Sequence, residues 1–196
     1  MVVATSWASG VNAYLCVFVL GLLGRFADVS AVPAALAQPD VLAIAGLMAA
    51  VELVVDKVPY VDTGWDAIST AIRPTIGAVL ALTLAAGAGN ELGPTRLALL
   101  AALGGATALV THATKAGIRL AVNTSPEPAS NIAVSAGENI ATAGIVLLAA
   151  YVPRVGLGVS LGLLAAGIAI IVALRPTVHR GYRRWRDHRR RVFTAP

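Results

Sequence analysis

Long apolar runs without charge are the feature that most constrains this chain. A helix needs about 20 mostly apolar residues to cross the hydrocarbon core of a bilayer. Six segments come close to or exceed that length, at residues 6–26, 40–57, 66–88, 96–119, 131–152 and 155–174. Only 13% of the residues are charged, where soluble domains have about 25%. We therefore predict an all-α, polytopic transmembrane helical bundle of about six spans, with one membrane domain over residues 1–175.

The second of these segments is the shortest and the most charged. It leads into the stretch VELVVDKVPYVDTGWD at 51–66, which contains four carboxylates and one lysine. An aspartate at the centre of a membrane helix costs about 2.5–3.5 kcal/mol, so such a group needs a partner, a water-filled cavity or a proton. Irregular backbone at membrane depth also needs protein or water around it. We therefore allow for a broken or re-entrant element near residues 52–66.

The acidic residues here fall on helical faces. Glu52 and Asp56 are four apart, and the start of the third segment places Asp62, Asp66, Ser69 and Arg73 at spacings of four, three and four. Residues three or four apart share a helix face, so Arg73 is expected to reach Glu52 or Asp56 across the helix interface. This pattern fits structural pairing between helices and an ion pathway equally well for Glu52.

A basic stripe follows on the fourth segment. His112, Lys115 and Arg119 share one face near its end, where cations complement the helix dipole and meet lipid headgroups. The functional alternative makes His112 a proton-relay partner of Glu52.

Three further polar residues interrupt apolar runs early, namely Asn12, Glu138 and Asn139. With Glu52, Asp56 and Arg73 they are candidates to line an ion pathway. The alternative for the two asparagines is a hydrogen bond between neighbouring helices.

The C-terminal tail, residues 176–196, is strongly basic. Eight of the fifteen Lys and Arg residues lie between Arg175 and Arg191. Such a segment after an apolar span marks the cytoplasmic side and binds anionic headgroups or an acidic partner. The arginines expected to do so are Arg180, Arg183, Arg184, Arg186, Arg189, Arg190 and Arg191. We do not expect nucleic-acid binding, although Tyr182 and Trp185 could stack on bases.

An even number of spans places the N-terminus in the cytoplasm as well. We expect no cleavable signal peptide, because no positive charge precedes the first apolar run and Arg25 interrupts it.

Motifs of soluble enzymes are missing from the sequence. It has no glycine-rich phosphate loop before a lysine, no paired Cys or His metal ligands and no GxSxG turn. We therefore expect no enzyme activity and no cofactor. Hard cations prefer oxygen ligands, so the acidic residues are also candidates to bind such a metal ion.

Four segments carry a resemblance to a known family. SGVNAYL, ELVVDKVPYVDTGWDAISTAIRPTIGA, THATKAGIR and GENIA resemble a bacterial family of small polytopic membrane proteins classed as a domain of unknown function. The resemblance covers most of the chain before the basic tail. It implies a multi-pass protein of the bacterial cytoplasmic membrane and no particular activity.

The motif ELVVDK is also similar to the acidic motif of the lysine-exporter-like cation exchangers. That similarity implies cation exchange through Glu52 and Asp56, although Val55 stands where those proteins have glycine. Our leading hypothesis is a small cation or proton-linked transporter or channel that uses membrane-embedded carboxylates. The alternative is a noncatalytic scaffold or accessory subunit, as a homo-oligomer or in a larger membrane complex, with a tail that binds lipids or a partner.

Overall fold

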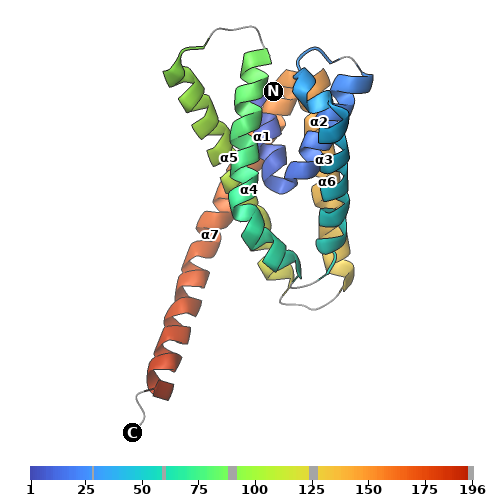
Figure 1. The fold of residues 1–196 in the computed structure, drawn as a ribbon. Helices are drawn as coiled ribbons and strands as arrows, with labels where there is room; N and C mark the ends of the chain where they lie inside the picture. Colours follow the sequence, from blue (N-terminus) through green and yellow to red (C-terminus); the bar gives the residue numbers. More distant parts are fainter. Residues whose placement is uncertain (28, 59–60, 88–91, 124–127, 194–196) are drawn as a thin grey trace.

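The computed structural model describes residues 1–27, 29–58, 61–87, 92–123 and 128–193, with side chains described up to residue 173 apart from residue 128. Every regular element in these ranges is a helix (Figure 1), which confirms the predicted all-α class. In chain order they are α1 (Val2–Val11), α2 (Ala13–Phe26), the short η1 (Ala34–Ala37), α3 (Pro39–Val55), α4 (Val61–Gly87), α5 (Pro94–Val122), α6 (Pro128–Tyr151) and α7 (Pro153–Phe193).

The first predicted span, residues 6–26, is wrong as a single crossing helix. Asn12 separates α1 from α2 and has an extended backbone, with φ −144° and ψ 100°. The Cys16 Sγ lies 3.4 Å from the Thr5 carbonyl oxygen, eleven residues away in sequence, whereas a continuous helix would separate them by about 16 Å. The chain therefore reverses at Asn12, and α1 and α2 form a hairpin with both outer ends at the same end of the bundle (Figure 1).

The interruption that we predicted near residues 52–66 is a turn between two helices. Helix α3 ends at Val55, a turn begins at Asp56, and α4 starts at Val61; residues 59–60 lie outside the described range. The structure places the interrupted helical element at Asn12 instead, because the asparagine side chain offers the backbone a cap in place of the next helical turn.

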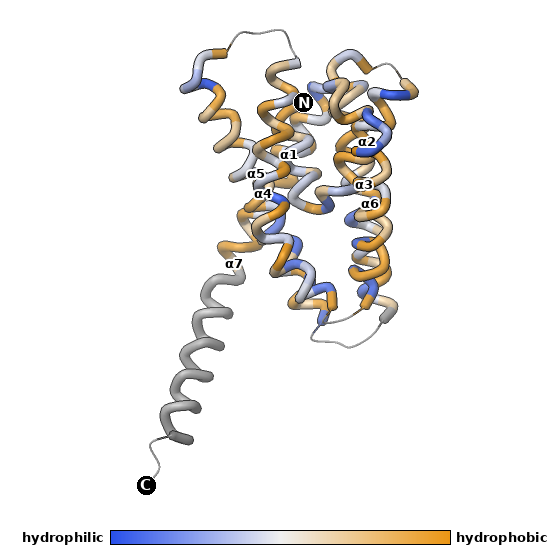
Figure 2. Tube along the Cα trace, viewed as in Figure 1, coloured by the Kyte–Doolittle hydropathy of each residue, from blue (hydrophilic) through white to orange (hydrophobic). Residues whose placement is uncertain are grey.

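Within the described residues, four helices are long and apolar enough to cross a membrane, namely α4, α5, Ala129–Tyr151 of α6 and Pro153–Ala173 of α7. Large apolar side chains on them are exposed, such as Leu99, Ile140 and Val172. Figure 2 shows hydrophobic stretches along these helices. The fold is therefore that of a multi-pass membrane protein, although the predicted number of six spans is not reached.

The two ends of the bundle differ in the elements they carry. Met1, η1 and the start of α7 lie at one end, which we call the hairpin end, and the turn between α3 and α4 lies at the other, which we call the turn end (Figure 1). Helix α7 runs from the hairpin end toward the turn end. The prediction that both chain termini are cytoplasmic stays a prediction. It depended on six crossings, and the reversal at Asn12 removes one.

Helices α4 and α5 make the most extensive contact in the bundle, and α1 lies against both. Glycines allow this approach: a Cβ added to Gly77 would lie 2.6 Å from the Cβ of Ala108, and one added to Gly104 would lie 2.4 Å from the Gly77 carbonyl oxygen. Small residues at such contacts let helix backbones come close in membranes. The polar faces of α4 and α5 are thereby brought within reach of each other.

Helix α7 is continuous through residue 175, where we predicted a boundary between membrane domain and tail, so that division stays a prediction. The arginine side chains that we predicted to bind lipids or a partner, Arg180 to Arg191, lie outside the described side chains.

Candidate functional site in the bundle core

Eight ionisable side chains from four helices meet inside the half of the bundle toward the turn end. We call them the charged cluster, and its members are Glu52 of α3 and Asp56 directly after it, Asp62, Asp66 and Arg73 of α4, Lys115 and Arg119 of α5, and Glu138 of α6. Seven of these side chains are at most 5% exposed, and Glu138, at 14%, is the most accessible. Spacings of three or four residues put the members from each helix on one face.

Arg73 joins α4 to α3. Its NH2 lies 2.5 Å from Glu52 Oε1 and 3.1 Å from Asp66 Oδ1. This contact confirms the prediction that Arg73 reaches across the helix interface, and Glu52 is the partner it finds. Both side chains are fully buried, so their mutual attraction offsets the cost of taking each charge out of water.

Lys115 lies at the centre of the charged cluster. Its Nζ is 2.8 Å from Asp56 Oδ2, 3.3 Å from Glu52 Oε1 and 3.6 Å from Glu138 Oε2. It also donates a hydrogen bond of 3.2 Å to the Val11 carbonyl oxygen. One ammonium group thus links α3, α5, α6 and the end of α1.

Arg119 binds the acids nearer the turn end. It contacts Glu138 with two nitrogens, NH2 to Oε2 at 2.5 Å and Nε to Oε1 at 3.2 Å. It also lies 3.3 Å from Asp56 Oδ2 and 3.5 Å from Asp62 Oδ2, and it donates to the Asp56 backbone carbonyl. A bidentate arginine contact of this kind fixes both partners in orientation.

Two buried asparagines extend the polar region toward the turn end. Asn123 Nδ2 donates to Asp62 Oδ1 at 3.0 Å, and Asn131 Nδ2 donates to Asn123 Oδ1 at 3.0 Å. A chain of polar contacts therefore runs from Arg73 in the middle of α4 to the turn end of the bundle.

His112 touches the inner end of the charged cluster. Its Nδ1 lies 2.7 Å from Arg73 NH1, and its Nε2 lies 3.0 Å from the Thr70 hydroxyl. A guanidinium only donates hydrogen bonds, so Nδ1 is the acceptor and the ring is neutral with its proton on Nε2. The predicted partnership with Glu52 is therefore indirect, because Arg73 stands between them.

The tip of the α1–α2 hairpin meets the charged cluster. The last carbonyls of α1 face cations: Lys115 binds the Val11 oxygen, and Arg73 NH1 lies 3.5 Å from the Gly10 oxygen. Cations are favourable at this end because the helix dipole leaves it partly negative. Asn12 caps α2 by accepting from Leu15 N at 2.9 Å, and its Nδ2 donates to Asn139 Oδ1 at 3.0 Å.

Several oxygens of the charged cluster have no hydrogen-bond partner in the structure. They are Glu52 Oε2, Asp56 Oδ1 and both carboxylate oxygens of Asp66, although Asp66 Oδ1 lies at ion-pair distance from Arg73. Buried polar atoms normally find partners. Arg73 Nε, a donor of the same cluster, also has no partner, so the cluster has both acceptors and a donor left for further hydrogen bonds.

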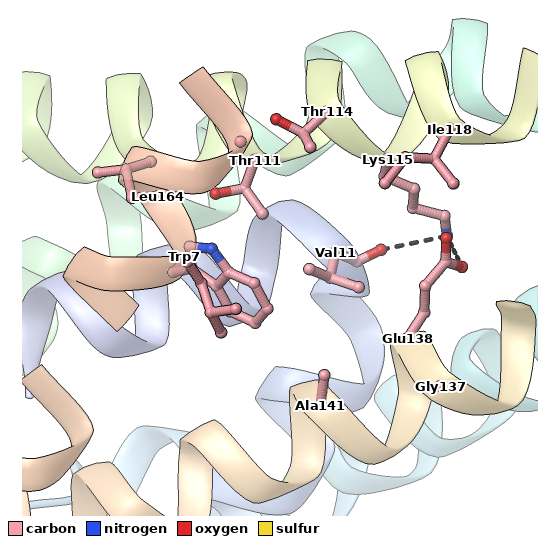
Figure 3. A pocket seen from close by; sticks show the side chains of 12 residues that line it. Trp7, Val11, Thr111, Thr114, Lys115, Ile118, Gly137, Glu138, Ala141 and Leu164 are labelled. Carbon is pink, nitrogen blue, oxygen red and sulfur yellow. Dashed lines mark hydrogen bonds and ion pairs between the residues drawn. The ribbon is translucent and has the colours of Figure 1, made fainter. Parts of the chain in front are cut away.

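A cavity of about 240 Å³ lies between α1, α5, α6 and α7. Figure 3 shows Lys115 and Glu138 at one end of it and Trp7 and Leu164 at the other. The cavity reaches the charged cluster at Glu138, while Glu52 does not line it. Solutes in the cavity can contact the cluster only on that side.

The predicted pathway residues come together in part. Glu52, Asp56, Arg73 and Glu138 belong to the charged cluster, and Asn12 and Asn139 bond to each other beside it, as the alternative for these asparagines predicted.

Four members, Asp62, Asp66, Lys115 and Arg119, were not among the predicted pathway residues, and the two basic ones were assigned to headgroups. Their spacing on α4 and α5 was the available signal. Lys115 and Arg119 are buried against carboxylates, which excludes headgroup contact in this structure.

In the part of the chain that the structure describes, no group of three or more His, Cys, Asp and Glu side chains is arranged to hold a metal ion. Comparison with protein families matched residues 1–173 to the model described as Domain of unknown function (DUF4126). Comparison with curated proteins gave no match. Comparison with solved structures gave none either.

Proposed function

Because this chain belongs to the family of the Domain of unknown function (DUF4126), whose description names no activity, we propose a function from its own site: a small membrane transporter or channel for protons or cations. In this proposal Glu52, Asp56 and Glu138 bind the transported charge. Arg73 holds Glu52 in place, and Asn12 and Asn139 hold the hairpin tip beside the pathway.

The excess of negative charge in the charged cluster carries this proposal. Five carboxylates face three cationic groups, and His112 is neutral. Uncompensated charge in the hydrocarbon region of a membrane is costly, and ionisable residues there commonly mark ion or proton pathways. Two more positive charges, as bound protons or cations, would neutralise the charged cluster. The cluster therefore has a reason to bind protons or cations, as a transport site must.

The hairpin supports the same function. Many transporters place substrate near the bilayer midplane, at the ends of interrupted helices whose dipoles and free carbonyls contact the bound charge. Here the C-terminal end of α1 and the N-terminal end of α2 meet at Asn12, next to Arg73 and Lys115. The similarity of ELVVDK to cation exchangers agrees, since Glu52 and Asp56 both belong to the charged cluster.

In a bacterial cytoplasmic membrane, the basic tail would place the turn end of the bundle on the cytoplasmic side. The polar chain through Asp62, Asn123 and Asn131 would then open to the cytoplasm, and Met1 would lie on the outer side.

The test is flux in liposomes. We expect Glu52→Gln to reduce proton or monovalent-cation flux by about tenfold or more. The neutral amide cannot bind the transported proton or cation as the carboxylate does. Asp40→Asn is the matched control, since Asp40 is an exposed acid at the start of the same helix, and it should leave flux unchanged. Thermal unfolding curves must show that both proteins are folded. Equal flux in wild type and Glu52→Gln would then remove Glu52 from the mechanism.

A scaffold or accessory subunit is the second candidate. The contact between Arg73 and Glu52, 2.5 Å long and fully buried, is what a purely structural pair would show. Under this alternative the full-length protein shows no flux, a double-mutant cycle on Arg73 and Glu52 gives strong coupling in stability, and deletion of the tail after Arg175 abolishes partner or lipid association.

A further inference from the structure

The cavity beside the charged cluster combines an apolar chamber with one accessible carboxylate. Trp7 and Val11 of α1 and Leu163 and Leu164 of α7 supply apolar walls. Glu138 lies at the opposite end, beside Lys115 (Figure 3). A cavity of this kind matches a molecule with one polar end and one apolar end.

The size of the cavity limits the occupant. Its volume is about 240 Å³, and an engineered apolar cavity of about 150 Å³ is large enough to hold benzene. By that comparison, the chamber beside Glu138 accommodates roughly ten non-hydrogen atoms. Exposed Gly137 and Leu163 form part of its lining, so the cavity opens at the surface between α6 and α7.

Charge decides which polar end fits. Lys115 is surrounded by three carboxylates and the Val11 carbonyl, so it has little left to offer an anion. Glu138 keeps 14% of its side chain exposed, and a carboxylate has about four lone-pair positions, enough to accept a further donor beside Arg119. Together with the excess of carboxylates in the charged cluster, this favours a cation in the cavity over an anion or a neutral molecule.

We propose that this cavity binds a small protonated organic amine. Its ammonium group lies against Glu138, and its apolar part lies between Trp7 and Leu164. That such an amine is also the solute carried across the membrane rests on the proposed function, whereas its binding does not.

Three probes of the same shape test the choice of ligand. Full-length protein in lipid nanodiscs is titrated by calorimetry with 2-phenylethylamine, with neutral 2-phenylethanol and with anionic 3-phenylpropanoate. We expect saturable binding of the amine, about tenfold or more tighter than that of the alcohol or the acid, because only the amine forms a charge-assisted contact with Glu138. Equal affinity for amine and alcohol would overturn the proposal, and so would preference for the acid.

Two variants locate the site. Leu164→Trp fills the apolar chamber without touching the charged cluster and should abolish amine binding. Its control is Ile140→Trp, at a side chain that is 73% exposed on α6 and does not line the cavity, which should bind the amine like wild type. Unchanged amine binding in a folded Leu164→Trp protein would place the ligand elsewhere and overturn the proposal.

Glu138→Gln should lower amine affinity about tenfold while leaving the weak binding of the alcohol as it was. This variant also removes a partner of Arg119, so thermal unfolding must first show that it folds. The comparison of the three probes uses the wild-type protein and does not depend on this variant. Flux measurements separate the two proposals. Amine binding without any flux would refute transport alone, and flux without amine binding would refute this inference alone.

Discussion

The two halves of the bundle bury opposite kinds of side chain on the same helices. Helix α4 buries Asp62, Asp66 and Arg73 in the half toward the turn end, and Leu80 and Leu84 in the half toward the hairpin end. Helix α6 repeats the pattern, with buried Asn131 and Ser135 followed by Ile145, Val146 and Ala149. Each helix therefore changes from a polar to an apolar interior at the level of the hairpin tip.

The hairpin closes the bundle in its apolar half. In the apolar half, the hairpin fills the space between the helices with side chains such as Trp7, Leu20 and Leu23, and no buried ion pair is found there among the described residues. In the polar half, contacts continue to the turn end through Asn123 and Asn131. A pathway across the whole membrane would therefore need the hairpin to move.

The largest expected effect comes from breaking the polar half. Arg119→Leu removes the cation beside Asp62 and leaves Asp56 and Glu138 with Lys115 alone. It should lower the free energy of unfolding by about 3–5 kcal/mol, because removing one member of a buried ion pair leaves its partner charged and uncompensated. Thermal or denaturant unfolding in detergent measures this. Arg154→Leu, at an exposed arginine, is the control. A loss below about 1 kcal/mol, the range of exposed pairs, would mean that the polar half is hydrated.

A smaller effect is expected where the halves meet. Gly104→Ala should destabilise the protein by about 1–3 kcal/mol, because the added methyl group overpacks the contact with Gly77. Gly144→Ala is matched in chemistry, and a Cβ there meets no atom within 4 Å, so its unfolding temperature should stay the same or rise slightly. Equal behaviour of the two variants would contradict the close packing of α4 on α5.

The smallest effects test the hairpin tip. Asn12→Ala removes the cap of α2 and should cost about 1 kcal/mol. Asn139→Ala removes only the hydrogen bond between the two asparagines and should cost about 0.6 kcal/mol, the average for such bonds in a membrane protein. Unfolding curves of both variants in the same detergent check this order. The reverse order would indicate that Asn12 serves mainly to hold α6.

Helical spacing allowed part of the charged cluster to be predicted from sequence. Glu52, Asp56 and Arg73 were placed correctly because residues three or four apart must share a face, whatever the surroundings. Lys115 and Arg119 were assigned to headgroups because sequence does not fix how deep a helix end lies. At the turn end, α4 and α5 extend several residues beyond the predicted spans, so Lys115 and Arg119 lie within the bundle and not at its surface.

The reversal at Asn12 could not be predicted from hydropathy. An apolar run of this length has the same composition whether it crosses the membrane or turns back halfway, because burial against other helices and burial in lipid favour the same residues. Gly10 and Asn12 mark the point of reversal, but their roles depend on contacts with residues far away in sequence. Gly10 lies against Ala108, and Asn12 bonds to Asn139.

The hairpin also has a consequence for how the chain is assembled. Its non-helical backbone at Asn12 tolerates membrane depth only when protein surrounds it, and the surrounding side chains, Arg73, Lys115 and Asn139, are synthesised later. The hairpin tip therefore has its protein surroundings only once α4, α5 and α6 lie against it.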